Sequence, residues 1–221
     1  MPRKYTHSEQ KTMTTGLTLE NFSYFVIFCL TMTFSPGPMT IFLLSLGLKS
    51  GLRSAFPAQM GASLAYLISI IIFAVGLSEI IKDYPLLTHT IQLTGISYII
   101  YLAYKQWTSK EIQINIHIDL KNFKDLFSKG MLTGMSNPKT ILMFTAVFPQ
   151  FSAQKEHQMI DISILGITFL ILQFASGCSY CYFGQRIKPL LDQPSRQSLL
   201  HKTSAVLLLA VAVMLSRSFL A

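Results

Sequence analysis

The sequence predicts an all-α integral membrane protein with six transmembrane helices, built as two inverted three-helix repeats whose helices one and four are broken at prolines. The first observation is composition. Of the 221 residues, 51% are hydrophobic and only 13% are charged, with a mean hydropathy of +0.45, more apolar surface than one soluble core can bury. The second is a series of apolar stretches of spanning length. The third is a proline motif that recurs in each half.

Six apolar stretches of about 20 residues or more can each cross a bilayer as a helix. The linkers between them are too short for a soluble domain. We expect residues 1–20 to be a polar tail and residues 21–221 a single domain, with repeat one at 22–107, a linker at 108–128 and repeat two at 129–220. The six spans are residues 22–47, 56–81, 86–107, 130–151, 160–183 and 199–220.

Two segments outside the spans have patterns of their own. From Ile112 to Ile118 an isoleucine stands at every second position, which is the period of a strand. We expect the linker at 108–128 to be extended and to lie on the membrane surface. The tail and the apolar run after it share features with a signal peptide, but the run is too long and lacks a small-residue cleavage pattern. We therefore expect the first span to be retained.

The net charge of +8 comes from basic residues in short runs between the spans. They form no continuous basic stripe, which argues against nucleic-acid binding. Linkers one, three and five carry eleven of the 18 Lys and Arg residues, the opposite side carries six, and Lys139 lies within a span. The positive-inside rule then places these linkers in the cytoplasm and both termini outside, in the inner (plasma) membrane.

The first helix of each half contains a proline break. Residues 35–38 read Ser-Pro-Gly-Pro, and an unbroken helix there would cost about 3 kcal/mol for each interior proline. Residues 137–138 read Asn-Pro and interrupt helix four. The sequence Pro-x-Thr-Ile occurs at 38–41 and again at 138–141. Because each repeat contains an odd number of spans, three, the second copy enters the membrane in the opposite sense, as in many secondary transporters.

A broken helix leaves free carbonyl groups and a new helix N-terminus at membrane depth, which is tolerated only inside protein or beside a wet cavity. The helix N-terminus attracts a carboxylate, and the unwound carbonyls attract a cation. An amino-acid-like zwitterion carries both charges. The alternative is a pair of structural kinks without a ligand. The candidate substrate-binding residues are Ser35, Pro36, Gly37, Pro38, Met39, Asn137, Pro138 and Lys139.

Lys139 is the strongest single candidate, because an unpaired charge within a span costs about 3 kcal/mol or more. We expect it to bind the substrate carboxylate or to respond to the proton gradient, unless it snorkels to the membrane interface. Other polar side chains stand within apolar helices, where they line a cavity or hydrogen-bond between helices. These are Gln59, Tyr66, Tyr98, Gln173 and Tyr180.

The two motifs resemble those of the LysE/RhtB family of amino-acid exporters, of the threonine, homoserine and lysine efflux type. Residues 35–38 are similar to the family motif that ends the first helix. Residues 130–139 resemble the motif that opens the fourth helix, the Phe-Pro-Gln-Phe at 148–151 resembles the family segment after it, and residues 47–51 resemble the family's glycine-bearing turn. The resemblance covers nearly the whole chain from about residue 22.

This resemblance implies export of amino acids or related small metabolites, driven by the proton motive force with H⁺ as the coupling ion. One position departs from the family pattern. Met39 stands where many members carry Asp or Asn, which implies a different or more apolar substrate.

Two other classes of protein are alternatives. Cys29, Cys178 and Cys181 would suit a transmembrane thiol–disulfide conduit, but their apolar neighbours favour plain packing. A membrane scaffold without transport activity is the second alternative. Motifs for metalloproteases, phosphate loops and aspartate pairs are absent, so we expect no enzyme activity, cofactor or metal. The expected partners are a small-molecule substrate and the lipid bilayer, and a homodimer is left open.

Overall fold

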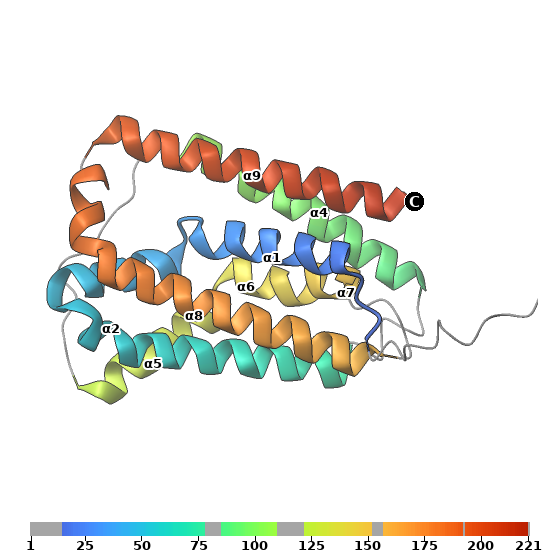
Figure 1. Cartoon of the computed structure of the whole chain (residues 1–221), viewed down its shortest axis with the longest axis horizontal. Coiled ribbons are helices and arrows are strands. Elements are labelled where there is room, and N and C mark those ends of the chain that lie inside the picture. Colours follow the sequence, from blue (N-terminus) through green and yellow to red (C-terminus); the bar gives the residue numbers. More distant parts are fainter. Residues whose placement is uncertain (1–14, 78–84, 110–121, 152–156, 192, 221) are drawn as a thin grey trace, which may run out of the picture.

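The computed structural model describes residues 15–77, 85–109, 122–151, 157–191 and 193–220, and all regular structure in these ranges is helical. The longer helices run along the long axis of the molecule, with α1 and α6 in its middle (Figure 1). In chain order the elements are α1 Leu19–Phe34, α2 Pro38–Ile72, the π-helix η1 Phe73–Leu77, α4 Pro85–Thr108, α5 Phe123–Met135, α6 Pro138–Leu142, the π-helix η2 Met143–Val147, α7 Phe148–Phe151, α8 Gln158–Leu191 and α9 Pro194–Leu220.

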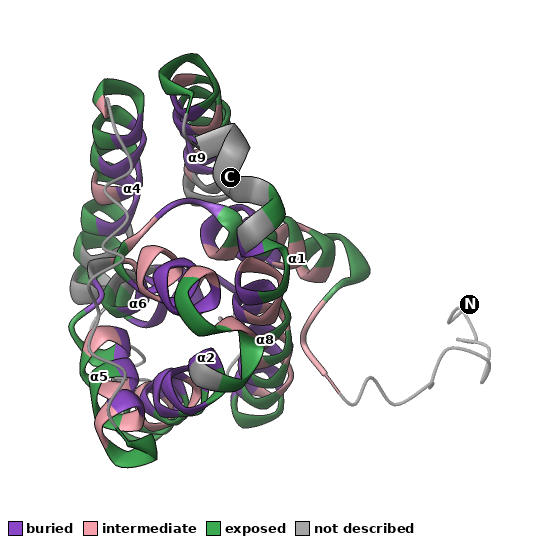
Figure 2. Ribbon diagram, turned by 90° about the vertical axis from the view of Figure 1, so that its left-hand side faces the viewer, coloured by how far each residue is buried: buried purple, intermediate pink, exposed green. Residues whose placement is uncertain are grey.

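The helices form two groups around α1. Helix α2 packs against α5 and α8, whereas α4 packs mainly against α9. Viewed along the bundle, α4 and α9 stand beside each other on one side of α1, and their buried residues face inward (Figure 2). The break between α1 and α2 therefore lies where the two groups meet.

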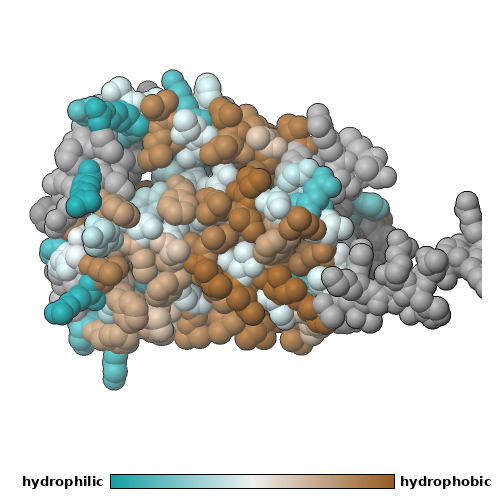
Figure 3. Space-filling view, in the orientation of Figure 1, coloured by the Kyte–Doolittle hydropathy of each residue, from teal (hydrophilic) through white to brown (hydrophobic). Residues whose placement is uncertain are grey.

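Much of the bundle's outer surface is apolar. Val75 of η1, Ile171 of α8 and Val213 of α9 are each more than half exposed. Apolar side chains cover the middle of the face in Figure 3, and hydrophilic ones gather at its left-hand end. Such a surface would promote aggregation in water and is compatible with lipid tails. The all-helical architecture with several apolar helices confirms the predicted class, an all-α membrane protein.

By length and composition, two helices in the described ranges can cross a membrane on their own, Ala55–Gly76 and Gln158–Gly184. A third span results if the bent pair Leu19–Phe34 and Pro38–Arg53 counts as one. Helix α4 agrees with the predicted third span to within one residue at each end. The count of six spans and the inverted repeat stay predictions.

The first predicted break is confirmed. Helix α1 ends at Phe34, and α2 begins at Pro38 after a turn of 55°. Ser35 is extended, with φ −79° and ψ 136°, because a residue before proline is kept out of the helical region. Pro38 occupies the first position of α2, where its missing N–H interrupts no helical hydrogen bond.

The second predicted break is also present, between Met135 at the end of α5 and Pro138 at the start of α6. The expectation for the linker before it is wrong at its C-terminal end. Helix α5 starts at Phe123, because the Asn122 side chain caps it by accepting a hydrogen bond from the Asp125 N–H at 3.0 Å. The isoleucine-rich part of that linker, and most of the predicted tail, lie outside the described residues.

Helices α8 and α9 extend beyond their predicted spans, toward each other. Helix α8 continues to Leu191, and α9 already starts at Pro194. Hydropathy marks where a helix leaves the apolar layer, not where its backbone hydrogen bonds end. Many of the polar residues assigned to the fifth linker therefore lie in α8 or α9.

A glycine turn divides α2 into two helices. Gly51 has φ 72° and ψ −170°, a conformation that L side chains rarely adopt. This turn lies in the segment that resembles the family's glycine-bearing turn. The longer part of α2 after it packs along α5, and here glycines allow close approach. A Cβ added to Gly61 would lie 2.0 Å from the Phe127 carbonyl oxygen, and one added to Gly130 would lie 2.0 Å from that of Ala58.

The substitution Gly130→Ala is therefore expected to force α2 and α5 apart and to destabilise the protein by about 1–3 kcal/mol, the usual cost of overpacking. Thermal unfolding of the purified protein in detergent measures the effect. The matched control is Gly76→Ala, because a Cβ at Gly76 meets no atom within 4 Å. Equal losses of Tm in the two variants would contradict this account of the packing.

Candidate functional site

The polar centre of the molecule is built on the break between α1 and α2. Because the helix stops before Pro36, the last carbonyl groups of α1 and those of the break have no helical N–H partner. In an apolar medium each unsatisfied carbonyl would cost several kcal/mol. Four of these carbonyls accept hydrogen bonds from side chains of other helices: those of Thr33, Phe34, Ser35 and Pro36.

Two of the four carbonyls are satisfied from α8. The Ser176 hydroxyl donates to the carbonyl of Thr33 at 3.0 Å, and the Tyr180 hydroxyl donates to that of Phe34 at 2.7 Å. Ser176 and Tyr180 are four residues apart, so they lie on the same face of their helix. One face of α8 thus takes over the role of the missing next turn of α1.

Lys139 satisfies the other two carbonyls. Its Nζ donates to the carbonyl oxygens of Ser35 and Pro36, both at 3.0 Å. A Cβ at Gly37 would lie 3.3 Å from Lys139 Nζ, so the glycine of the motif leaves room for the lysine. Lys139 turns into the break and does not snorkel to the interface. The cation at the unwound carbonyls is therefore one of the chain's own side chains.

Gln106 and His201 extend this network to the other group of helices. Gln106 Nε2, on α4, donates to Ser35 Oγ at 2.7 Å and to the Pro36 carbonyl at 2.9 Å. Gln106 Oε1 lies 2.7 Å from His201 Nδ1, on α9. Both side chains are buried, with exposed fractions of 7% and 4%. The Pro36 carbonyl thus receives donors from both sides of the bundle.

Neither of these two residues was predicted from the sequence, although a signal was present. On α4 the buried positions Ile99, Leu102 and Ala103 continue to Gln106, the spacing of one helix face. On α9 the face with Leu208 continues back to His201 in the same way. A polar residue on an otherwise apolar buried stripe is a candidate interior site, but each stood beside a lysine and was assigned to the end of a span.

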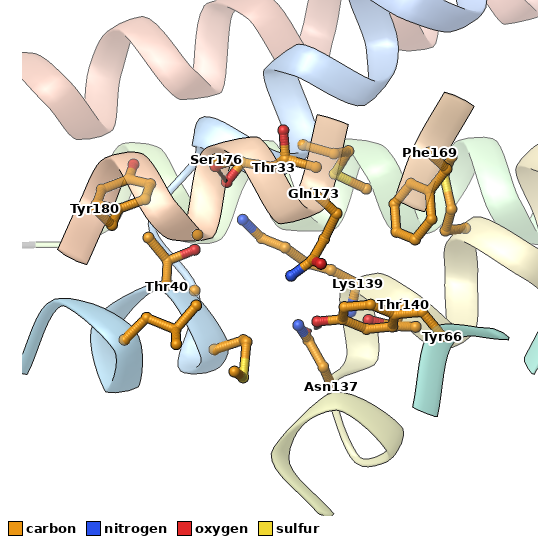
Figure 4. A pocket seen from close by; sticks show the side chains of 16 residues that line it. Thr33, Thr40, Tyr66, Asn137, Lys139, Thr140, Phe169, Gln173, Ser176 and Tyr180 are labelled. Carbon is orange, nitrogen blue, oxygen red and sulfur yellow. Dashed lines mark hydrogen bonds between the residues drawn. The ribbon is translucent and has the colours of Figure 1, made fainter. Parts of the chain in front are cut away.

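A cavity of about 50 Å³ adjoins the break. Figure 4 shows Lys139 extending across it from α6 and Gln173 pointing into it from α8. This volume holds a few water molecules, not an amino acid, so the site must widen to take up a solute. Its apolar lining includes Met32, Met39, Leu43, Met143 and Phe169. Its polar lining comprises Thr33, Thr40, Tyr66, Asn137, Lys139, Thr140, Gln173, Ser176 and Tyr180.

The structure brings most of the predicted site residues together. Gly37, Met39, Asn137 and Lys139 line the cavity. Ser35 and Pro36 contribute their carbonyls, while Pro38 and Pro138 begin α2 and α6. The Asn137 side chain caps α6 by accepting a hydrogen bond from the Lys139 N–H at 3.1 Å.

The other polar side chains singled out from the sequence have different positions. Tyr66, Gln173 and Tyr180 line the cavity. Gln59 lies behind it and donates to Gln173 Oε1 at 3.0 Å. Tyr98 is not among the lining residues, and its ring lies 5.5 Å from that of Tyr101 on the same helix.

Phenylalanine rings fill the bundle between the cavity and α7. Phe169, at the cavity wall, contacts Phe144 edge-on with ring centroids 5.4 Å apart, and Phe144 contacts Phe148 at 5.0 Å. Phe148 in turn packs against Phe25 at 5.6 Å. The Phe-Pro-Gln-Phe motif thus belongs to an aromatic core that closes one side of the site.

None of the three cysteines is among the residues that line the cavity. Cys29 and Cys181 are buried in the hydrophobic core, and Cys181 Sγ lies 3.5 Å from the Leu43 carbonyl oxygen. These surroundings agree with the interpretation that the cysteines serve as small packing residues.

A helical membrane protein with a satisfied, polar break at its centre has the features of a translocator. A family model described as LysE type translocator matches residues 30–218, and the chain belongs to this LysE/RhtB family. It is 26% identical over 199 residues to a homoserine/homoserine lactone efflux protein of Salmonella typhimurium and 25% identical over 199 residues to the protein of that name from Salmonella typhi. Each alignment covers 88% of this chain and 97% of the relative. No solved structure matches the chain.

Tyr180→Phe removes the donor to the Phe34 carbonyl and is expected to cost about 0.5–1.5 kcal/mol, the net contribution of one intramolecular hydrogen bond. Thermal unfolding of the purified protein in detergent measures this loss. Tyr182→Phe on the same helix is the matched control, since Tyr182 is 65% exposed. If both variants unfold at the wild-type temperature, the carbonyl contact contributes nothing to stability.

Proposed function

We propose that the protein is a secondary transporter that exports amino acids or closely related small metabolites across the inner membrane. The observation that carries this proposal is the break itself. An ammonium, amides and hydroxyls converge on it inside an apolar helical bundle, in a chain whose relatives are named homoserine/homoserine lactone efflux proteins. Such discontinuous helices form the substrate sites of many transporters.

The cavity lining favours substrates with no net positive charge. Among the described residues that line it, Lys139 is charged and no carboxylate is present. Lys139 suits a substrate carboxylate, while the hydroxyl and amide oxygens of Thr33, Thr40 and Gln173 can accept hydrogen bonds from an ammonium or a hydroxyl group. A lysine-like substrate would add a second cation with no counter-charge. The substrate class is therefore a neutral amino acid such as homoserine.

Lys139 would act by exchanging partners. In the structure its Nζ is held by the carbonyls of Ser35 and Pro36, and thus ties the second proposed repeat to the first. A substrate carboxylate offers the ammonium a stronger, charge-assisted hydrogen bond. Its arrival would loosen the tie, so that one triplet can rock against the other in alternating access. Met39, buried at the cavity wall, would tune which side chain fits.

The finer parts of the proposal concern topology and driving force. Linkers one, three and five would lie in the cytoplasm and both termini outside, in accord with the distribution of Lys and Arg. Residues 22–107 and 129–220 would form the inverted repeats, together supplying six spans. Export would be driven by the proton motive force, with H⁺ as the coupling ion.

Cells that overexpress the protein and are loaded with homoserine are expected to release it faster than cells carrying the empty vector. A protonophore should abolish most of the difference, because it removes the driving force. Release of lysine from parallel cells is the control and should not change. Unaltered homoserine release would refute this substrate, and protonophore-resistant release would refute proton coupling.

Lys139→Ala should abolish export while the membrane abundance of the protein, measured by immunoblot, stays at the wild-type level. Each lost charge-assisted hydrogen bond is worth about 1.5–3 kcal/mol, which corresponds to roughly 10- to 100-fold in binding. Lys129→Ala on the exposed face of α5 is the matched control and should export normally. Normal efflux from the Lys139 variant would exclude the assigned role.

A further inference from the structure

The histidine at the far end of the polar network has an unused nitrogen. His201 is 4% exposed on α9, and its Nδ1 lies 2.7 Å from Gln106 Oε1. Its other ring nitrogen, Nε2, is buried and has no hydrogen-bond partner among the described groups. Buried polar atoms without a partner are rare and usually have a functional reason.

The hydrogen bonds fix which nitrogen carries the proton. The Pro36 carbonyl can only accept, so the Gln106 group that lies 2.9 Å from it must be the NH₂. The Gln106 oxygen must then face His201, and it too can only accept. His201 therefore donates through Nδ1–H. In the neutral ring this leaves the lone pair on Nε2 free to take up a proton without disturbing the bond to Gln106.

Among the described residues, few charged groups act on this histidine. From α6, the charge of Lys139 acts on the His201 ring. Lys139 contacts the Pro36 carbonyl directly, and His201 is linked to it by way of Gln106. From α8, the titratable residue Tyr180 packs against Leu44, as does Leu200, the residue before His201. Helix α4 carries Lys105 and α9 carries Lys202, both exposed. The last turn of α1 and the break after it, residues 30–37, contain no titratable residue.

We propose that His201 is the proton-binding group of the transporter and that Gln106 relays its charge to the break. The inference rests on the proposed function. One proton from the aqueous phase binds the Nε2 lone pair and turns the imidazole into an imidazolium, with no other bond made or broken. Of all side chains, histidine has the unperturbed pKa that suits such a switch near neutral pH.

Protonation of His201 would change the competition for the Pro36 carbonyl. An imidazolium is a stronger donor to Gln106 Oε1, which polarises the amide and strengthens its donation to that carbonyl. Lys139 Nζ donates to the same oxygen, so its hold weakens, and the second positive charge repels it further. Proton binding thereby changes the hydrogen bonding of Lys139, the residue proposed to bind the substrate carboxylate. The protonation state of His201 and the binding of substrate would therefore be coupled through the break.

The test uses the purified full chain in liposomes with radiolabelled homoserine and compares wild type, His201→Asn and His89→Asn. Asn keeps a donor near the position of Nδ1 but cannot take up a proton. Two rates are measured: homoserine counterflow without a pH gradient, and accumulation driven by a gradient between about pH 6 and pH 8. His89 is exposed near the start of α4, so its variant controls for loss of any histidine.

We expect His201→Asn to retain counterflow but to lose gradient-driven accumulation at least about tenfold. A factor of ten corresponds to the loss of about 1.4 kcal/mol of coupling free energy between proton and substrate. His89→Asn should behave as wild type. Gln106→Met removes the hydrogen bonds that link His201 to the Pro36 carbonyl but leaves the histidine in place, and it should lose accumulation as well. If one of the two variants folds poorly, the other still tests the inference.

Three results would overturn the inference. Wild-type accumulation by both His201→Asn and Gln106→Met would exclude His201 as the coupling group. Loss of counterflow together with accumulation in both variants would reduce the pair to a structural role. Wild-type protein that moves no homoserine under either condition would instead overturn the proposed function, and the inference with it, so the two failures are told apart by the wild-type measurement alone.

Discussion

The structure depends on one constraint: backbone carbonyls that prolines have freed in an apolar medium must find donors. Pro36 and Pro38 end one helix and begin another inside the bundle. At this depth the freed carbonyls cannot rely on water as a hydrogen-bond donor. The donors come from α4, α6 and α8, so both groups of helices contribute. The break is thus the point to which the rest of the bundle is fastened, and it determines the positions of Ser176, Tyr180, Lys139 and Gln106.

This arrangement connects the two groups of helices at one site, the break between α1 and α2. Helix α8 belongs with α2 and α5, whereas α4 belongs with α9. Both groups donate to the same few residues of backbone. A displacement of either group must therefore exchange hydrogen bonds at the break, and such exchange is discrete, not gradual. Close packing at Gly61 and Gly130 holds α2 and α5 against each other.

The breaks could be predicted because they depend on local chemistry. The tertiary contacts around them could not be predicted in this way. Proline lacks an N–H and restricts the residue before it, so residues 35–38 and 137–138 mark their breaks in any context. The cap at Asn122 is equally local but was hidden among the charges of a linker. The partners of Lys139 depend on how distant segments pack. Gln106 and His201 could have been found only by tracing a buried helical face, since composition around them resembles the end of a span.

The lysine at the break also has a consequence for the empty protein. Unwound carbonyls at membrane depth can coordinate sodium ions, and an ion site of that kind would offer a path for leakage. Here the positions beside Ser35 and Pro36 are already filled by a tethered ammonium, whose local concentration far exceeds that of any dissolved ion. The same side chain that would select the cargo would therefore also keep dissolved cations out of the break while no cargo is bound.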